Sequence, residues 1–371
     1  MNTQIDKIPP LQFLFAIIAF VQGSSLLSQF TLSISKHDTW ICVINAFVLS
    51  IFLILLFNVL MKKFPGMTII EINEVVFGKI VGKIISLLYL FYFLSLTTLN
   101  LRDVCVFTNR AVLPETPMAI IAVALVFICA YTVRKGIRAT TSYGFLIVCL
   151  ATVVTVTNSI LLIKEMKIDN FLPILSLSMK EYIQCTHVNT AITFGEIFVF
   201  FMLMPNLTRP KDSKKMLLWG LLFGALTLML IVGRDIAVLG ESITFLTMQT
   251  YETIKLLHVA DIITRSEILY AIILIALQFF KASILYYATV KAISQIFGLK
   301  NYKHITYALG TVMTSYVLFV HPDSFDSAYW GASTAVFFSS TFNILLPIIT
   351  VIIMLLRRNS IDSKLKGARA T

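Results

Sequence analysis

Apolar stretches of about 20 residues recur along most of the chain, separated by short polar connectors. An α-helix rises about 1.5 Å per residue, so a stretch of this length crosses the hydrocarbon core of a bilayer. The pattern predicts an all-α integral membrane protein with ten transmembrane helices. The predicted spans are residues 11–30, 40–60, 84–107, 118–133, 142–163, 186–204, 216–236, 268–293, 305–319 and 329–356.

Composition supports a membrane protein. Hydrophobic residues make up 58% of the chain and charged residues 13%, whereas ordinary soluble domains carry about 25% charge. The first stretch, residues 11–30, is longer than the apolar region of a secretory signal, so we expect it to be a span. The connectors are mostly too short for separate domains, which predicts one membrane domain over residues 1–358 and a short basic tail over 359–371.

The charge distribution predicts the orientation. If the amino terminus is cytoplasmic, most of the 30 Lys and Arg residues fall in connectors on the cytoplasmic side, as the positive-inside rule requires. We therefore expect both termini in the cytoplasm. The net charge of +11 does not indicate nucleic-acid binding, because the basic residues occupy connectors rather than one face of a soluble domain.

Two of the predicted spans are interrupted by small or polar residues. These are Gly23, Ser24 and Ser25 in the first span, and Thr190, Thr193, Gly195 and Glu196 in the sixth. Transporters built from inverted repeats bind their substrate where such discontinuous helices meet near the membrane midplane. Small residues also allow ordinary close packing of helices. The residues alone leave both interpretations open.

Charged residues inside predicted spans are further candidates. Glu196 and Lys281 lie at similar depth, so we hypothesise that they approach each other or contact the charged ends of a zwitterionic ligand. A purely structural ion pair is the alternative. Arg102 and Arg234 each follow a long apolar run and could extend to the outer headgroups. We do not expect Asp235 to be the partner of Arg234, because adjacent helical residues point in different directions.

Motifs of enzymes and metal sites are missing from the sequence. It contains no P-loop, HExxH or GxSxG motif, its five cysteines have no CxxC spacing, and its five histidines are not spaced as ligands. We therefore predict no enzymatic activity, no metal site and no cofactor.

A set of short markers spread over most of the chain carries a family resemblance. The markers are residues 8–27 (IPPLQFLFAIIAFVQGSSLL), 101–102 (LR) with 113–117 (LPETP), 134–136 (RKG), 171–174 (FLPI), 194–196 (FGE), 238–240 (VLG) and 279–283 (FFKAS). In this order and spacing they resemble the spore germination permease family, the B subunits of GerA-type nutrient receptors, a branch of the amino acid/polyamine/organocation superfamily.

The resemblance implies a LeuT-like fold, in which helices one to five and six to ten form inverted repeats and helices one and six are broken. It also implies a ligand site among helices one, three, six and eight. By position, its residues would be Gly23, Ser24, Ser25, Arg102, Phe194, Gly195, Glu196, Lys281 and Ser283.

The function implied by the resemblance is the sensing of a small nutrient, such as an amino acid, at the inner membrane of a dormant spore. A B subunit of this kind is expected to work with an A-type membrane subunit and a C-type lipoprotein subunit. A proton- or cation-coupled amino acid permease and a partner-gated water or ion passage are alternatives on the same fold. The sequence does not separate them, because a fold does not fix a function.

Overall fold

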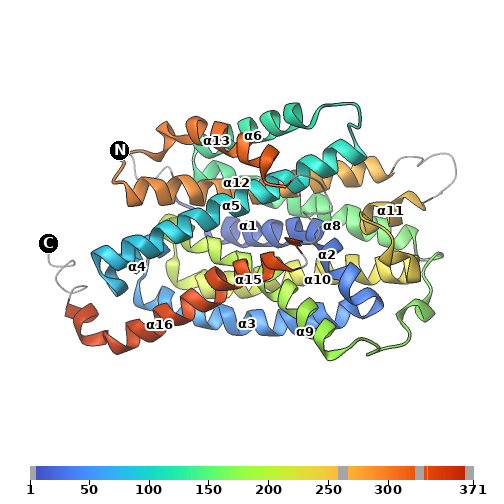
Figure 1. Ribbon diagram of the computed structural model, residues 1–371, viewed down its shortest axis with the longest axis horizontal. Helices are drawn as coiled ribbons and strands as arrows, with labels where there is room; N and C mark the ends of the chain where they lie inside the picture. Colours follow the sequence, from blue (N-terminus) through green and yellow to red (C-terminus); the bar gives the residue numbers. More distant parts are fainter. Residues whose placement is uncertain (1–5, 258–265, 322–329, 332, 364–371) are drawn as a thin grey trace.

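The computed structural model describes residues 6–257, 266–321, 330–331 and 333–363. Within these ranges the chain is helical, with no β-strand beyond one isolated bridge between Ile8 and Leu207. The long helices lie along the long axis of the molecule (Figure 1). Eight helices in the described part are long and apolar enough to cross a membrane. The predicted all-α membrane fold is therefore confirmed.

The helices of the first half are α1 (Pro10–Gly23), η1 (Ser24–Leu27), α2 (Ser28–Ser35), η2 (Lys36–Asp38), α3 (Thr39–Lys63), α4 (Ile69–Phe77), α5 (Lys79–Ala111), α6 (Met118–Lys135), α7 (Ile137–Ser142), α8 (Gly144–Leu161) and η3 (Ile168–Phe171). Those of the second half are α9 (Met179–Val188), η4 (Asn189–Phe194), η5 (Gly195–Asn206), η6 (Pro210–Asp212), α10 (Ser213–Leu239), η7 (Gly240–Thr244), α11 (Gln249–Lys255), α12 (Ser266–Ile296), η8 (Tyr302–His304), α13 (Thr306–Phe319), α15 (Thr334–Ser340), η9 (Thr341–Leu345) and α16 (Leu346–Leu356).

The predicted count of ten spans is not confirmed. The first predicted span is divided among α1, η1 and α2, and its apolar part, Pro10–Leu26, is shorter than the eight long helices. The ninth corresponds to α13, which has only 14 residues. Residue 329, at the start of the tenth predicted span, and residues 364–371 of the predicted tail lie outside the described residues.

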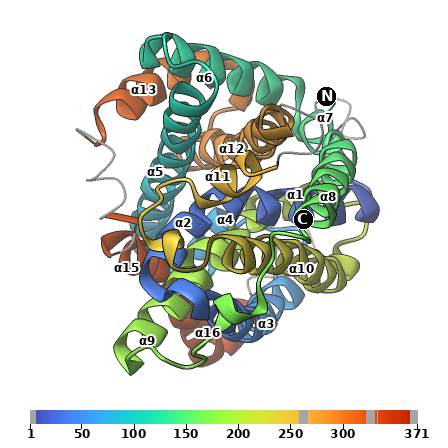
Figure 2. The same cartoon turned by 90° about the vertical axis from the view of Figure 1, so that its right-hand side faces the viewer.

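Helix α1 occupies the interior of the bundle. Proline at its first position, Pro10, suits a helix start because that position needs no backbone N–H. The helix packs against α8, α10 and α12, which surround it in the end-on view of Figure 2. Its residues from Ala16 to Gly23 are buried. This central position places the end of α1, and the η1 turn after it, among the helices that form the candidate site.

Glycines on α10 set the distance between α10 and α1. A Cβ atom at Gly220 would lie 2.5 Å from Ile17 Cγ2, and one at Gly224 would lie 2.6 Å from Val21 Cβ. Both contacts are shorter than van der Waals distance, so the two helices approach because these positions have no side chain. This matches the packing role expected of a GxxxG pair.

We expect Gly224→Ala to destabilise the protein by about 1–3 kcal/mol, because the added methyl group forces α10 away from α1. Gly233→Ala is the matched control, since it lies on the same helix and a Cβ there meets nothing within 4 Å. The control should be neutral or slightly stabilising, as alanine favours helices over glycine. Thermal unfolding of the purified variants measures both effects, and equal melting temperatures would contradict the packing argument.

The connectors predicted to be cytoplasmic gather at one end of the molecule. Ile8 pairs with Leu207, Gln12 Nε2 donates to the Arg138 carbonyl at 2.6 Å, and Arg357 Nη1 donates to the carbonyl of Val76 at 2.7 Å. Figure 1 shows α4 and the C-terminal part of α16 at this end, and α11 at the opposite end. The first and last described segments thus lie at the same end as the basic connectors.

Candidate functional site

An ion pair lies at the centre of the helix bundle. Lys281 Nζ, from α12, lies 2.8 Å from Glu196 Oε2, from η5, and the two side chains are 0% and 1% exposed. The same ammonium donates to Ser24 Oγ at 2.9 Å and lies 5.1 Å from the centre of the Phe20 ring. The buried Lys281 ammonium therefore connects α12 to the first span through Ser24 and to the sixth span through Glu196.

Helix geometry changes where the first and sixth spans reach this pair. The α-helix α1 ends at Gly23 and passes into a 3₁₀ turn at Ser24. In the sixth span a π-helical segment, Asn189–Phe194, is followed by a 3₁₀ segment that begins at Gly195. Such changes are frequent at functional sites because the helix no longer forms uniform i→i−4 bonds. Both coincide with the predicted interruptions.

Glycines allow the close approach of backbone at both changes. A Cβ atom at Gly23 would lie 3.1 Å from the Leu277 carbonyl oxygen and 3.3 Å from Lys281 Cβ. One at Gly195 would lie 2.7 Å from the Thr190 carbonyl oxygen. A side chain at Gly23 would therefore press α1 against α12, and one at Gly195 would displace the Thr190 carbonyl. Gly23 and Gly195 thus occupy the two positions where a larger residue would meet a backbone carbonyl.

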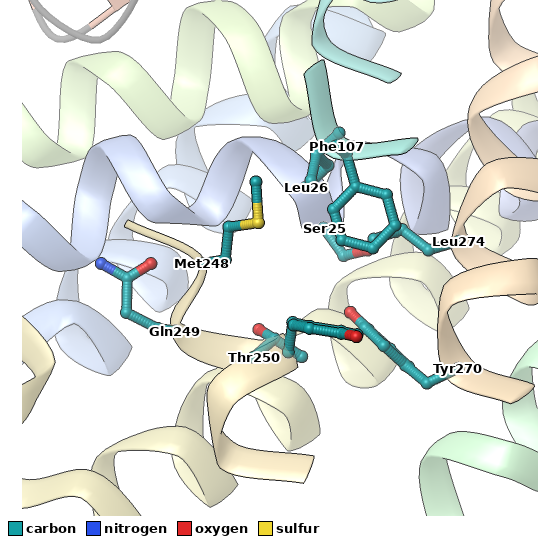
Figure 3. Close-up of a pocket in the computed structure, with 9 residues that line it drawn as sticks. Ser25, Leu26, Phe107, Met248, Gln249, Thr250, Tyr270 and Leu274 are labelled. Atoms are coloured by element: carbon teal, nitrogen blue, oxygen red, sulfur yellow. The ribbon is translucent and has the colours of Figure 1, made fainter. Parts of the chain in front are cut away.

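A hollow opens next to the 3₁₀ turn of the first span, and we name it the Ser25 hollow. It has a volume of about 260 Å³ including its open mouth, of which about 20 Å³ is accessible to a water-sized group. Its lining residues are Ser25, Leu26, Phe107, Met248, Gln249, Thr250, Tyr251, Tyr270 and Leu274. Figure 3 shows Phe107 and Leu274 close to Ser25, with Tyr270 across the hollow beside Thr250. The walls combine aromatic and aliphatic surface with hydroxyl groups, as small-solute sites commonly do.

A second hollow lies on the Glu196 side of the pair, and we name it the Asp103 hollow. It has a volume of about 410 Å³ including its mouth. Its lining residues are Leu96, Leu99, Asn100, Asp103, Ile192, Glu196, Trp330, Gly331, Ala335 and Ser339. The enclosed part of this hollow is only about 30 Å³, enough for a group about the size of a water molecule. Glu196 thus contacts Lys281 and also lines this hollow.

The structure does not bring all the predicted site residues together. Gly23, Ser24, Glu196 and Lys281 meet at the ion pair, Gly195 adjoins it, and Ser25 lines the neighbouring hollow. Phe194 is fully buried as the last residue of the π-helical segment.

Arg102 and Ser283 point elsewhere. The Arg102 guanidinium donates to the carbonyls of Val317 and His321, at 2.9 and 2.7 Å, and so holds α5 to the end of α13. Ser283 Oγ donates to Cys129 Sγ of α6 at 3.6 Å. Both side chains are buried, and neither lines the two hollows.

The expectation that Asp235 would not pair with Arg234 is wrong. Arg234 Nε and Nη2 donate to Asp235 Oδ1 at 3.0 and 2.8 Å, and both side chains are 0% exposed. A long arginine side chain can fold back along the helix surface to reach its neighbour. The second oxygen, Asp235 Oδ2, accepts from Thr250 Oγ1, which connects the pair to the wall of the Ser25 hollow.

Sequence reasoning missed Asp103 and Asn100, which line the second hollow. The signal was present, because Asp103 is a carboxylate within an apolar predicted span, and ionisable residues there are functional candidates by default. Trp330 and Ser339, on the facing wall, carried no comparable signal.

Solved structures with the same arrangement of helices are transporters. The chain matches the nucleobase-cation-symport-1 family transporter Mhp1 with a TM-score of 0.71 and 11% identity, covering 96% of this chain and 80% of that one. It matches MhsT, solved in complex with L-phenylalanine, with a TM-score of 0.67 and 11% identity, covering 94% and 99%. The likeness shows that the chain has the LeuT-like transporter fold that the resemblance implied. It does not confirm that helices one and six are broken.

The family follows from the sequence comparisons. A family model described as "Spore germination protein" matches residues 7–325. Spore germination protein KB of Bacillus subtilis (strain 168) is 29% identical over 306 residues, covering 81% of each chain. Spore germination protein B2 of the same organism is 22% identical over 345 residues, covering 89% of this chain and 91% of the relative. The chain belongs to this spore germination protein family.

Proposed function

We propose that this chain is the B subunit of a spore nutrient receptor, and that it binds a small nutrient where the first, sixth and eighth spans meet. The observation that carries the proposal is the buried Lys281–Glu196 pair, joined to Ser24 and bordered by two hollows. A sensor needs two states that differ in their affinity for the ligand. A zwitterion can compete for the ion pair because it carries both charges, and so can favour a rearranged state.

The partners and location belong to the same proposal. We infer an A-type membrane subunit and a C-type lipoprotein subunit as partners, and the inner membrane of the spore as the location, because the chain belongs to the spore germination family. We infer that both termini face the cytoplasm, since the first and last described segments lie with the basic connectors.

Spores that lack this chain should lose germination in response to one class of nutrient and keep their response to the others. The assay follows loss of optical density after each member of a nutrient panel is added to deletion spores and to spores with the gene restored. Restoring the gene should restore the response. Normal germination of deletion spores on every nutrient would contradict the receptor function.

A cation-coupled permease is the second candidate, and the fold likeness to symporters favours it. The two functions differ in what the chain does alone. Saturable, gradient-driven uptake of a labelled amino acid by proteoliposomes that contain only this chain would support the permease. Binding without accumulation would support the receptor.

A further inference from the structure

The polar side chains of the Asp103 hollow all carry acceptor oxygens. Asp103, Glu196, Asn100 and Ser339 supply two carboxylates, an amide and a hydroxyl. No lysine or arginine lines the hollow in the part of the chain that the structure describes. The nearby ammonium of Lys281 does not line the hollow and is bonded to Glu196 and Ser24.

One acceptor in this wall has no donor. Asn100 is 3% exposed, and its Nδ2 donates to the Leu96 carbonyl at 2.9 Å, whereas its Oδ1 has no hydrogen-bond partner among the described residues. Buried polar atoms are nearly always paired in native structures, so a donor that entered the hollow and reached this oxygen would satisfy it.

The two carboxylates of the hollow differ in their partners. Lys281 and Arg102 both attract Asp103, but neither forms an ion pair with it. Lys281 pairs with Glu196, so Asp103 is left with no ion-pair partner within 4 Å in the described part of the chain. Arg102 is adjacent in sequence, but its guanidinium is bonded to the carbonyls of Val317 and His321. A group with one positive charge and several donors would complement this surface.

An ammonium group has these properties. It carries three donors, no acceptor and one positive charge. Trp330 also lines the hollow, and an aromatic ring attracts a cation to its face. A carboxylate or a sugar hydroxyl fits less well, because the first is repelled by Asp103 and the second brings no charge. Within the described residues no group of His, Cys, Asp and Glu is arranged to hold a metal ion.

We propose that the Asp103 hollow is the subsite for the ammonium group of the ligand, with Asp103 as its counter-charge and Asn100 Oδ1 as a further acceptor. The ligand is therefore an amine or an amino acid, rather than a sugar or a hydroxy acid. The proposal rests on the proposed function, because it names the part of the ligand that this site recognises.

Matched ligand pairs test the proposal on the purified full chain in lipid nanodiscs. Each common L-amino acid is compared with its 2-hydroxy acid analogue, and ethanolamine with ethylene glycol, by thermal shift and by titration. At least one amine should raise the melting temperature, and its hydroxyl partner should not. Equal shifts within every pair, or no shift by any amine, would overturn the proposal. An equal shift by NaCl or KCl alone would also overturn it, because it would indicate an inorganic cation site.

Asp103→Asn provides the second test, because it removes the counter-charge while keeping the size of the side chain. We expect the dissociation constant of the active amine to rise about 10- to 100-fold, as for loss of a charge-assisted hydrogen bond. Asp169→Asn, at an exposed carboxylate in η3, is the matched control and should leave the dissociation constant of the active amine unchanged. Unchanged affinity in a well-folded Asp103→Asn variant would contradict the role of Asp103. The comparison of wild-type ligand pairs does not depend on that variant folding.

The two proposals fail in different ways. Deletion spores that lose their response to a sugar or a hydroxy acid alone would support the receptor function and overturn the ammonium subsite. Amine binding by the purified chain, together with normal germination of deletion spores, would support the subsite and overturn the receptor function.

Discussion

Lys281→Met should abolish the response to ligand and lower the stability of the protein by about 3–5 kcal/mol. The substitution keeps much of the side-chain volume but removes the ammonium, so Glu196 remains as a buried carboxylate without its partner. Ser24 also loses its donor at 2.9 Å. The stability effect is measured by thermal unfolding in nanodiscs, and the response by germination of spores that carry the variant.

The double variant Lys281→Met/Glu196→Gln separates stability from recognition. Because no buried charge remains unpaired, most of the lost stability should return, as it does when both partners of a buried pair are replaced together. The ligand response should stay absent in both variants. Lys291→Met is the matched control, since Lys291 is the other lysine of α12 and is partly exposed. A normal ligand response in the double variant would show that the ion pair is only structural.

The membrane class and the similar depth of Glu196 and Lys281 could be predicted because both depend on local features. A stretch of about 20 apolar residues defines a span without knowledge of its neighbours. Glu196 and Lys281 could be placed at similar depth because span length fixes the depth of each residue. Whether they pair or each contact one end of a ligand could not be decided from the sequence. The LeuT-like fold, by contrast, came from the family resemblance, because the order of helices in space does not follow from periodicity.

Other parts of the site depend on contacts between distant segments. Arg102 was assigned to the site from its position, but its guanidinium is bound by carbonyls near the end of α13, and no local pattern shows which carbonyls lie within reach. The Arg234–Asp235 contact was rejected because the directions of adjacent Cβ atoms were considered without the length of the arginine side chain. The predicted count of ten spans is not confirmed because α13 and the apolar part of the first span are short.

Asp235→Asn should destabilise the protein by about 3–5 kcal/mol and weaken the ligand response. Arg234 is 0% exposed and would keep its charge without a counter-ion. Asp235 Oδ2 also accepts from Thr250 Oγ1 of α11, which lines the Ser25 hollow. The substitution therefore loosens one wall of that hollow as well as the ion pair. Thermal unfolding and germination of spores that carry the variant measure the two effects.

Glu252→Gln is the matched control for Asp235→Asn, because it breaks an exposed ion pair in the same region, whereas Asp235→Asn breaks a buried one. Glu252 and Lys255 pair on the surface of α11, with 36% and 45% of their side chains exposed. An exposed pair contributes at most about 1 kcal/mol, since both charges stay hydrated when it is broken. The control should therefore melt close to the wild type and keep its ligand response. If Asp235→Asn melted at the same temperature as Glu252→Gln, neither the buried ion pair within α10 nor the Asp235–Thr250 hydrogen bond between α10 and α11 would contribute measurably to stability.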